Sequence, residues 1–181
     1  GVTMILGVVG SPRKGGNTEI LVRRVLESAR AQGAEVKLLH LGEMEIAPCR
    51  SCLRCERQGS CVIEDGMSLA YRDLLRARAI VLGTPVYYWN VSAQLKAFMD
   101  RTYCFAPGRR LRGKLGAAVV VARRAGCTAA FQAILGYFTI HRMRPAGGVI
   151  AYGDAPGDVE RDAMGMGEAE ALGRALARLL G

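Results

Sequence analysis

Short apolar runs alternate along the chain with longer segments whose apolar residues recur at helical spacing. The runs 3–10 and 79–85 are almost continuously apolar, which is typical of strands buried on both faces. Segment 19–33 has a helical period and reaches Gly33, a natural stop, at its end. The side that would face the core comprises Leu21, Val22, Val25, Leu26 and Ala29. The pattern therefore opens on strand, turn and helix.

The same alternation continues to the end of the chain. It predicts further strands at 35–41, 114–122 and 147–153, and helices at 67–77, 92–103, within 128–142 and at 160–180. Ser92 is a plausible N-cap for the helix that follows it. Strands of this length alternating with helices indicate βαβ units and a parallel sheet. We predict an α/β three-layer sandwich with a five-stranded parallel sheet in the flavodoxin-like order 2-1-3-4-5, which places ligands between the first and third strands.

Length and composition favour one well-packed unit. A chain of 181 residues, half of them apolar, is long enough for a single domain over 1–181, with a Cys-rich loop at 48–62 inserted after the second strand. No apolar run is long enough to cross a bilayer, and the N-terminus lacks the pattern of a signal peptide. We therefore expect a cytoplasmic protein without a membrane partner, in a compartment where structural disulfides are rare.

Net charge is +9, and part of the excess is clustered. The cluster comprises Arg109, Arg110, Arg112, Lys114, Arg123 and Arg124. A nucleic-acid site would also need a reading helix or stacking aromatics, and aromatic residues make up only 6% of the chain. We expect no nucleic-acid partner. The cluster is interpreted as a solvated rim, or as a field that steers an acidic redox partner or a phosphate-bearing cosubstrate.

The stretch "GSPRKGGNT" (10–18) follows the first strand, where this topology places a phosphate site. Its small residues let the backbone bend toward a ligand, and the following helix points free N–H groups at the loop. Ser11, Asn17 and Thr18 add hydrogen bonds, and Arg13 offers a forked contact to phosphate oxygens. The spacing matches neither a P-loop nor the dinucleotide pattern. We interpret it as a monophosphate site; a simple turn is the alternative.

The stretch "TPVYYWNVS" (84–92) follows the third strand, on the other side of the same switch point. A proline and backbone amides flanked by three consecutive aromatic residues make a flat slot that suits a fused heteroaromatic ring. Together with a phosphate loop, this slot describes a planar mononucleotide, which flavin mononucleotide (FMN) fits. The alternative is an aromatic cluster that covers the core.

Four cysteines lie within the Cys-rich loop, as C-x2-C-x2-C-x5-C through Cys49, Cys52, Cys55 and Cys61. Two successive x2 gaps bring three thiolates around one corner of a cubane, and Cys61 could close the same site. Tetrahedral zinc usually uses two separated CxxC knuckles. A [4Fe–4S] cluster, zinc, and idle or redox-sensing thiols all stay open on the residues alone. The other two cysteines, at 104 and 127, are expected in the core or a loop.

Three motifs carry a resemblance to a known family: "GSPRKGGNTE", the four-cysteine loop running into "CVIEDGM", and "GTPVYYWNVSAQLKAFMDR". Together, over about residues 5–105, they resemble the NADPH-dependent FMN reductase family and its iron–sulfur flavoprotein branch. The resemblance implies FMN, a [4Fe–4S] cluster on the four cysteines, and a homodimer or homotetramer. On the FMN phosphate it puts Ser11, Arg13, Asn17 and Thr18, and around the isoalloxazine ring Pro85, Val86, Tyr87, Tyr88 and Trp89. A third flavin loop after the fourth strand would add Gly126, beside Arg124 and Ala125.

From these features we expect an FMN-dependent oxidoreductase that passes electrons from a ferredoxin-like donor or from NAD(P)H to a small-molecule acceptor. No catalytic side chain is assigned, because a flavin carries its own chemistry. His40 and His141 are interpreted as structural. One alternative keeps the flavin without the cluster, as an NAD(P)H:FMN or quinone reductase. Another is a non-catalytic electron carrier, or a redox sensor whose thiols bind zinc or form disulfides.

Overall fold

A computed structural model describes residues 3–181, so the first two residues of the predicted domain lie outside the described part. Five strands form one parallel sheet in the order β2-β1-β3-β4-β5. The strands are β1 (Met4–Val9), β2 (Glu35–His40), β3 (Ala79–Pro85), β4 (Leu115–Ala122) and β5 (Arg144–Tyr152). The end of β1 pairs with both neighbours, Val9 with His40 and with Gly83. The predicted sheet and its order are confirmed.

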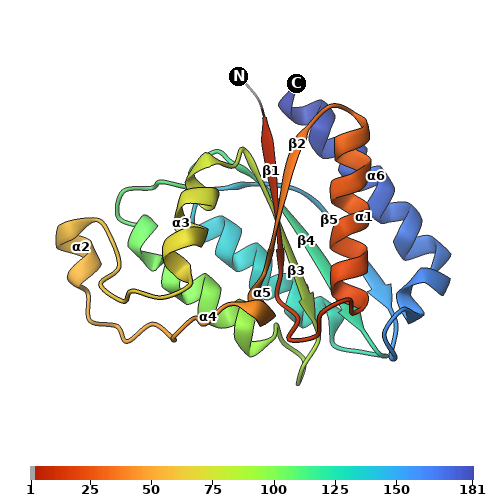
Figure 1. Ribbon diagram of the computed structural model, residues 1–181, viewed down its shortest axis with the longest axis horizontal. Helices are drawn as coiled ribbons and strands as arrows, with labels where there is room; N and C mark the ends of the chain where they lie inside the picture. Colours follow the sequence, from red (N-terminus) through yellow and green to blue (C-terminus); the bar gives the residue numbers. More distant parts are fainter. Residues whose placement is uncertain (1–2) are drawn as a thin grey trace.

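Helices cover both faces of this sheet (Figure 1). They are α1 (Asn17–Ala31), α2 (Arg54–Gln58), α3 (Met67–Arg76), α4 (Ala93–Arg101), α5 (Cys127–Ile140) and α6 (Ala163–Leu180). Figure 1 shows α1 and α6 side by side on one face and α3, α4 and α5 on the other. This arrangement confirms the predicted three-layer, flavodoxin-like sandwich. None of the helices in the described residues is long and apolar enough to cross a membrane.

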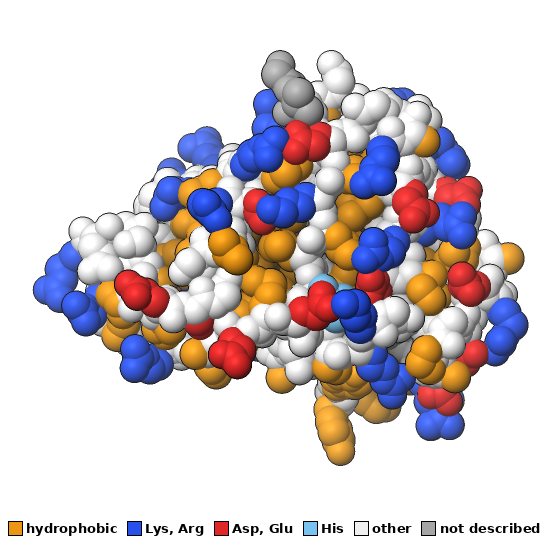
Figure 2. Space-filling model, in the orientation of Figure 1, with side chains coloured by type: hydrophobic (Ala, Val, Ile, Leu, Met, Phe, Trp, Pro, Cys, Tyr) orange, Lys and Arg blue, Asp and Glu red, His pale blue; other side chains and the backbone are white. Residues whose placement is uncertain are grey.

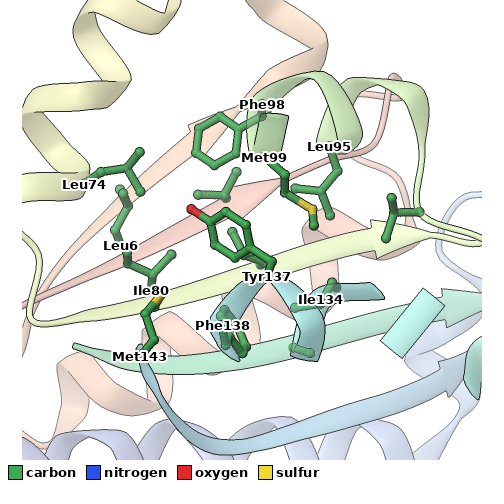
Figure 3. Close-up of a cluster of buried hydrophobic side chains, with 14 of the residues drawn as sticks. Leu6, Leu74, Ile80, Leu95, Phe98, Met99, Ile134, Tyr137, Phe138 and Met143 are labelled. Carbon is green, nitrogen blue, oxygen red and sulfur yellow. The ribbon is translucent and has the colours of Figure 1, made fainter. Parts of the chain in front are cut away.

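The core has two halves because side chains alternate across the strands. Met4, Leu6 and Val8 of β1 pack toward α3, α4 and α5, whereas Ile5 and Val9 pack toward α1 and α6. Figure 3 shows the first half, in which Leu6 and Ile80 of the sheet meet helix residues. The helix residues labelled there include Leu74, Leu95, Phe98, Met99, Ile134, Tyr137 and Phe138. The two almost continuously apolar runs of the sequence, 3–10 and 79–85, are strands β1 and β3.

Helix α1 packs closely on the sheet because glycine stands beneath it. A Cβ added at Gly83 would lie 2.4 Å from Val22 Cγ2, closer than real Cβ contacts allow. Helix α1 begins at Asn17, directly after the loop 10–16. The sequence therefore sets the first helix with its N-terminus at the carboxyl ends of β1 and β3.

The Cys-rich loop leaves the sheet after β2 and returns at α3, as predicted. It contains one element that the sequence pattern does not predict, the five-residue helix α2. The backbone is left-handed at Leu53 and Gly59 on either side of this helix, and again at Ser51. The region around α2 extends away from the sheet at the end of the molecule opposite α1 and α6 (Figure 1). Of its four cysteines, Cys49 and Cys52 are exposed, whereas Cys55 and Cys61 are partly buried against the core.

Candidate flavin crevice and four-thiol loop

A crevice of about 260 Å³ opens at the carboxyl ends of the strands. The loops after β1, β3, β4 and β5 all reach it, as the switch-point rule predicts. Its lining is Ser11, Arg13, Asn17, Thr18, Pro85, Val86, Tyr87, Val121, Arg123, Gly153 and Asp154. Two segments far apart in sequence, 11–18 and 85–87, therefore form opposite parts of one site. Seven of the ten residues predicted to bind the cofactor lie here.

The first segment combines buried hydroxyls with the start of a helix. Ser11 and Thr18 are almost completely buried, and Ser11 Oγ accepts a hydrogen bond from Arg13 N at 3.1 Å. None of the described side chains caps α1 at Gly16, so the N–H groups of the first turn are left for another acceptor. Such a helix start favours an anion such as a phosphate.

Glu19 holds this loop from behind. Its carboxylate accepts hydrogen bonds from Gly15 N at 2.7 Å and from Arg23 Nε at 2.8 Å. His40 Nε2 lies 3.3 Å from the same carboxylate and 3.2 Å from the Arg13 carbonyl oxygen. Burial alone would raise the pKa of Glu19, but the Gly15 N–H and the Arg23 guanidinium outweigh it and hold the pKa below its ordinary value. Glu19 and His40 therefore have structural roles under the crevice.

Asn17 binds a loop that the sequence analysis did not include in the site. Its side-chain nitrogen donates to the Ala155 carbonyl at 2.9 Å, and its side-chain oxygen accepts from Gly157 N at 2.9 Å. The loop after β5 is thereby fixed beside α1, and it brings Gly153 and Asp154 into the crevice. The turn-rich "GDAPGD" after the fifth strand was the only available signal for this contribution. A phosphate contact from Asn17 stays a prediction.

Charge around the crevice is mixed. Arg123 Nε forms an ion pair with an Asp154 side-chain oxygen at 3.1 Å, and Arg13 Nη1 lies 3.5 Å from the Asp154 carbonyl oxygen. Both guanidiniums belong to exposed residues. Each can turn toward an incoming phosphate, because an exposed ion pair is only weakly held.

The second segment is a tight turn with an aromatic tip. Tyr87 and Asn90 exchange backbone hydrogen bonds, and the two residues between them, Tyr88 and Trp89, both have positive φ angles. Bulky residues rarely adopt this conformation, and such strain is concentrated at functional sites. Tyr88 is fully exposed and Trp89 is 65% exposed. Neither lines the crevice, so their predicted contact with the ring stays a prediction. Figure 2 shows hydrophobic side chains projecting where this loop leaves β3.

Backbone contacts hold the two segments together. Gly10 N donates to the Gly83 carbonyl at 2.8 Å, and Ser92 Oγ donates to the Gly10 carbonyl. Ser92 also accepts from Leu95 N, which confirms it as the N-cap of α4. Gly126 lies against the aromatic turn, since a Cβ there would be 2.8 Å from Val86 Cγ1. Gly126 does not line the crevice itself, so its predicted contact with the cofactor also stays a prediction.

A second and larger cavity, of about 660 Å³, lies beneath the Cys-rich loop. All four loop cysteines, Cys49, Cys52, Cys55 and Cys61, line it together with residues from α4 and α5. None of the six cysteines of the chain forms a disulfide. Cys104 and Cys127 are buried in the core, as predicted.

The donor chemistry of this cavity fits an iron–sulfur cluster, because four free thiols around one space are the ligand set of a cubane. Among residues 3–181, no three Cys, His, Asp or Glu side chains close in on a single metal position. One zinc ion would need its thiolates about 2.3 Å from one point. A cubane carries each thiolate on a different iron and so holds them farther apart.

The loop thiols differ in electrostatic surroundings. Burial, followed by the three neighbouring loop thiols, raises the pKa of Cys55. Burial alone would raise the pKa of Cys61 too, but the Ile63 N–H and the Arg101 guanidinium outweigh it, and that pKa is lowered. Arg101 itself is completely buried. The buried guanidinium of Arg101 thus stands beside Cys61.

The fold and crevice define a flavodoxin-like α/β protein, and solved structures agree on the fold. An NAD(P)H:quinone oxidoreductase from Methanothermobacter marburgensis superimposes with a TM-score of 0.77 at 16% identity, covering 97% of this chain and 96% of that one. An archaeal flavodoxin superimposes with a TM-score of 0.65 at 16% identity, covering 99% of each chain. At such identities the likeness concerns the fold alone.

Sequence comparison goes further. Residues 3–156 match the family described as NADPH-dependent FMN reductase, and the chain belongs to that family. It is 37% identical to an iron–sulfur flavoprotein of Methanocaldococcus jannaschii over 97% of this chain and 96% of the relative. It is 36% identical to an iron–sulfur flavoprotein of Methanosarcina thermophila over 90% and 87%. The resemblance to this branch is confirmed, and the protein is a flavin-dependent oxidoreductase.

Proposed function

We propose that this protein passes electrons between a [4Fe–4S] cluster on the four-thiol loop and FMN in the crevice, from a ferredoxin-like donor or NAD(P)H to a small acceptor. The observation that carries the proposal is the crevice, where a helix start and an aromatic turn form opposite parts of one site. When bound, FMN would supply hydride and single-electron chemistry and the cluster single-electron transfer. The chain's own residues would bind and orient both groups.

Size and lining decide how FMN would lie. At about 260 Å³, the crevice is slightly smaller than typical ligand pockets, which range from about 300 to 1,000 Å³. It therefore suits the phosphate and its chain, with Ser11, Thr18 and the first N–H groups of α1 holding the phosphate. Arg13 would add a charged contact from the rim. The ring would lie outward along 85–89, where acceptors reach it from solvent.

The four-thiol loop would hold the cluster through Cys49, Cys52, Cys55 and Cys61. All four cysteines line one cavity, which supports this assignment, as do the names of the curated relatives. The cavity is on the α4–α5 side of the molecule, away from α1.

Assembly and partners complete the proposal. We infer a homodimer or homotetramer, because the aromatic tip Tyr88–Trp89 and Ile140 leave large apolar side chains in solvent. An acidic, ferredoxin-like donor suits the net charge of +9 and the exposed arginines of the Cys-rich loop. Light scattering of the purified protein tests the assembly; a monomer at micromolar concentration would contradict it.

Anaerobic purification tests the two cofactors together. Visible spectra are expected to contain flavin bands and a broad shoulder that bleaches on reduction, with iron and acid-labile sulfide in equal amounts. Cys52→Ala should remove the shoulder and the iron while leaving the flavin bands. Iron that persists in this variant would contradict the ligand assignment. Oxidation of NADPH and of a reduced ferredoxin, measured separately, then identifies the donor.

A second candidate is a cluster-free NAD(P)H:FMN or quinone reductase. It is favoured by one observation, that no three potential metal ligands among residues 3–181 already converge on one point. Flavin bands alone, with no iron after anaerobic reconstitution and with rapid NAD(P)H oxidation, would support this candidate over the first.

A further inference from the structure

We propose that Arg101 and Asp65 form a buried clamp that closes the base of the Cys-rich loop, and that Arg101 places its positive charge beside the cluster. This inference rests on the proposed function, since it concerns the four-thiol loop. Arg101 is the last residue of α4, far in sequence from every loop cysteine, and it has no solvent exposure. Its role would be that of a positioning residue.

The contacts of the guanidinium join the two ends of the loop. Arg101 Nη1 donates to the Ala47 carbonyl at 2.8 Å, immediately before the loop begins at 48. Arg101 Nη2 donates to the Ile63 carbonyl at 3.1 Å, immediately after the loop ends at 62. One planar side chain therefore joins the two ends of the thiol-bearing loop.

Asp65 completes the clamp from the other side. Its two carboxylate oxygens accept from Arg101 Nη1 at 2.6 Å and from Nη2 at 3.0 Å, a forked pair. The same carboxylate accepts from Ala47 N at 2.9 Å and from Met67 N at 3.0 Å. Asp65 thus ties the loop entry to the start of α3, and the paired charges satisfy each other in a buried place.

Other contacts of the loop are weaker and more exposed. Tyr103 donates to the Glu56 carboxylate at 2.7 Å, and Arg110 donates to the Gly59 carbonyl at 3.3 Å, both near α2 and both exposed. The loop has no other buried side-chain ion pair among the described residues. Arg101 and Asp65 therefore supply the buried ionic contact at its base, beside the backbone bond from Gly66 N to the Glu45 carbonyl.

The same guanidinium faces the thiols. Arg101 lines the cavity together with Cys49, Cys52, Cys55 and Cys61, and its Nε is buried without a hydrogen-bond partner among the described residues. The side chain also lies next to Cys61. An unpartnered N–H at this position is suited to a cysteine sulfur or a cluster sulfide, and outer contacts of this kind tune a metal centre.

The experiment compares four variants in the full-length protein: Arg101→Lys, Arg101→Gln, Asp65→Asn and Lys96→Gln. Lys96 is the matched control, because it belongs to the same helix and forms only an exposed pair with Asp100. FMN titration and circular dichroism first establish that each variant is folded. Asp65→Asn serves as the second route if Arg101→Gln does not fold.

After anaerobic reconstitution, we expect Arg101→Gln and Asp65→Asn to retain iron about 10-fold or more less tightly than the wild type against a chelator. Lys96→Gln should match the wild type. Lysine keeps the charge but lacks the fork, so Arg101→Lys should lose iron while its remaining cluster keeps a near-native potential. The remaining cluster in Arg101→Gln should have a lower potential. Iron retention equal to the control in both Arg101→Gln and Asp65→Asn would overturn the clamp. Equal potentials in Arg101→Lys and Arg101→Gln would overturn the role of the Arg101 charge.

Amide exchange gives a readout that needs no metal. In the cluster-free protein, the N–H groups of Ala47 and Gly66 are held at the loop base and should exchange faster in Arg101→Gln and Asp65→Asn than in Lys96→Gln. Unchanged exchange would overturn the clamp. If the wild type takes up no iron while the variants still exchange these amides faster, the proposed cluster is refuted and the clamp is supported.

Discussion

At the scale of single residues, buried charges support both candidate sites from beneath. Glu19 lies under the crevice and Asp65 under the Cys-rich loop, and each accepts backbone N–H groups as well as an arginine. Neither carboxylate would touch a cofactor itself. Their effect on function would come from keeping a loop in the shape that a ligand requires.

Glu19→Gln is expected to lower the free energy of unfolding by about 1–3 kcal/mol, because a buried charge-assisted network loses its anion. FMN should bind more weakly, since Gly15 N–H loses its strong acceptor. Urea unfolding and FMN titration measure the two effects. Glu27→Gln, on the exposed side of the same helix, is the control. Equal stability of the two variants would contradict the structural role of Glu19.

The pH dependence of stability follows from the same groups. The pKa values of Glu19 and Asp65 are lowered from their ordinary values of 4.5 and 3.8. Groups with lowered pKa values stabilise the fold fully above those ordinary values, and their contribution is lost as the pH falls through the lowered values. Stability should therefore change little between about pH 7 and 5 on account of these groups and fall below about pH 4. The disadvantage of Glu19→Gln should shrink over the same acidic range.

At the scale of elements, the sequence predicts every strand and the long helices, because buried runs and helical periods are local signals. It does not predict α2, whose five residues lie between left-handed positions and have no helical period. The contribution of Gly153 and Asp154 was also missed, since it depends on Asn17 holding a distant loop. The clamp by Arg101 joins segments that only the fold brings together. Motifs indicate single loops, whereas contacts between loops require the structure.

The approach of the loop after β4 to the aromatic turn gives a test at this scale. Gly126 has φ near +90°, and a Cβ would lie 2.8 Å from Val86 Cγ1 and 3.1 Å from Trp89 Cα. Gly126→Ala should cost about 1–2 kcal/mol and weaken FMN binding by displacing the aromatic turn. Gly136→Ala, inside helix α5 with nothing within 4 Å of the added Cβ, should stabilise by about 0.5–1 kcal/mol. Differential scanning calorimetry and FMN titration measure both. Unaltered FMN affinity in Gly126→Ala would contradict a role for this turn.

At the scale of the whole molecule, the crevice and the four-thiol cavity occupy different parts of one layered body. The crevice is at the carboxyl ends of the strands, while the thiols line a cavity between the Cys-rich loop and helices α4 and α5. Figure 2 shows Lys and Arg side chains at the end of the surface where α2 lies in Figure 1. Arg50, Arg54 and Arg57 are exposed there. Under the proposed function, this positive charge would attract an acidic donor toward the thiols.

Replacing Arg54 and Arg57 together by glutamine should slow reduction by an acidic ferredoxin-like donor by about 10-fold at low salt. The difference should disappear near 1 M salt, where the screening length is about 3 Å. Stopped-flow kinetics measure the rates, and iron content establishes that the cluster is intact. Arg178→Gln, on an exposed part of α6, is the control. A double variant that reacts like this control at low salt would contradict a role of Arg54 and Arg57 in attracting the donor.

The central claim, that FMN binds with its phosphate on residues 11–18, is tested most directly by comparing FMN with riboflavin. Fluorescence-quenching titrations of the flavin-free protein should give at least about 10-fold tighter binding for FMN, since charge-assisted hydrogen bonds are worth about 1.5–3 kcal/mol. Thr18→Val, which removes only a hydroxyl from the buried lining, should reduce that preference. Equal affinity for the two flavins, or a preference that Thr18→Val leaves unchanged, would contradict the claim.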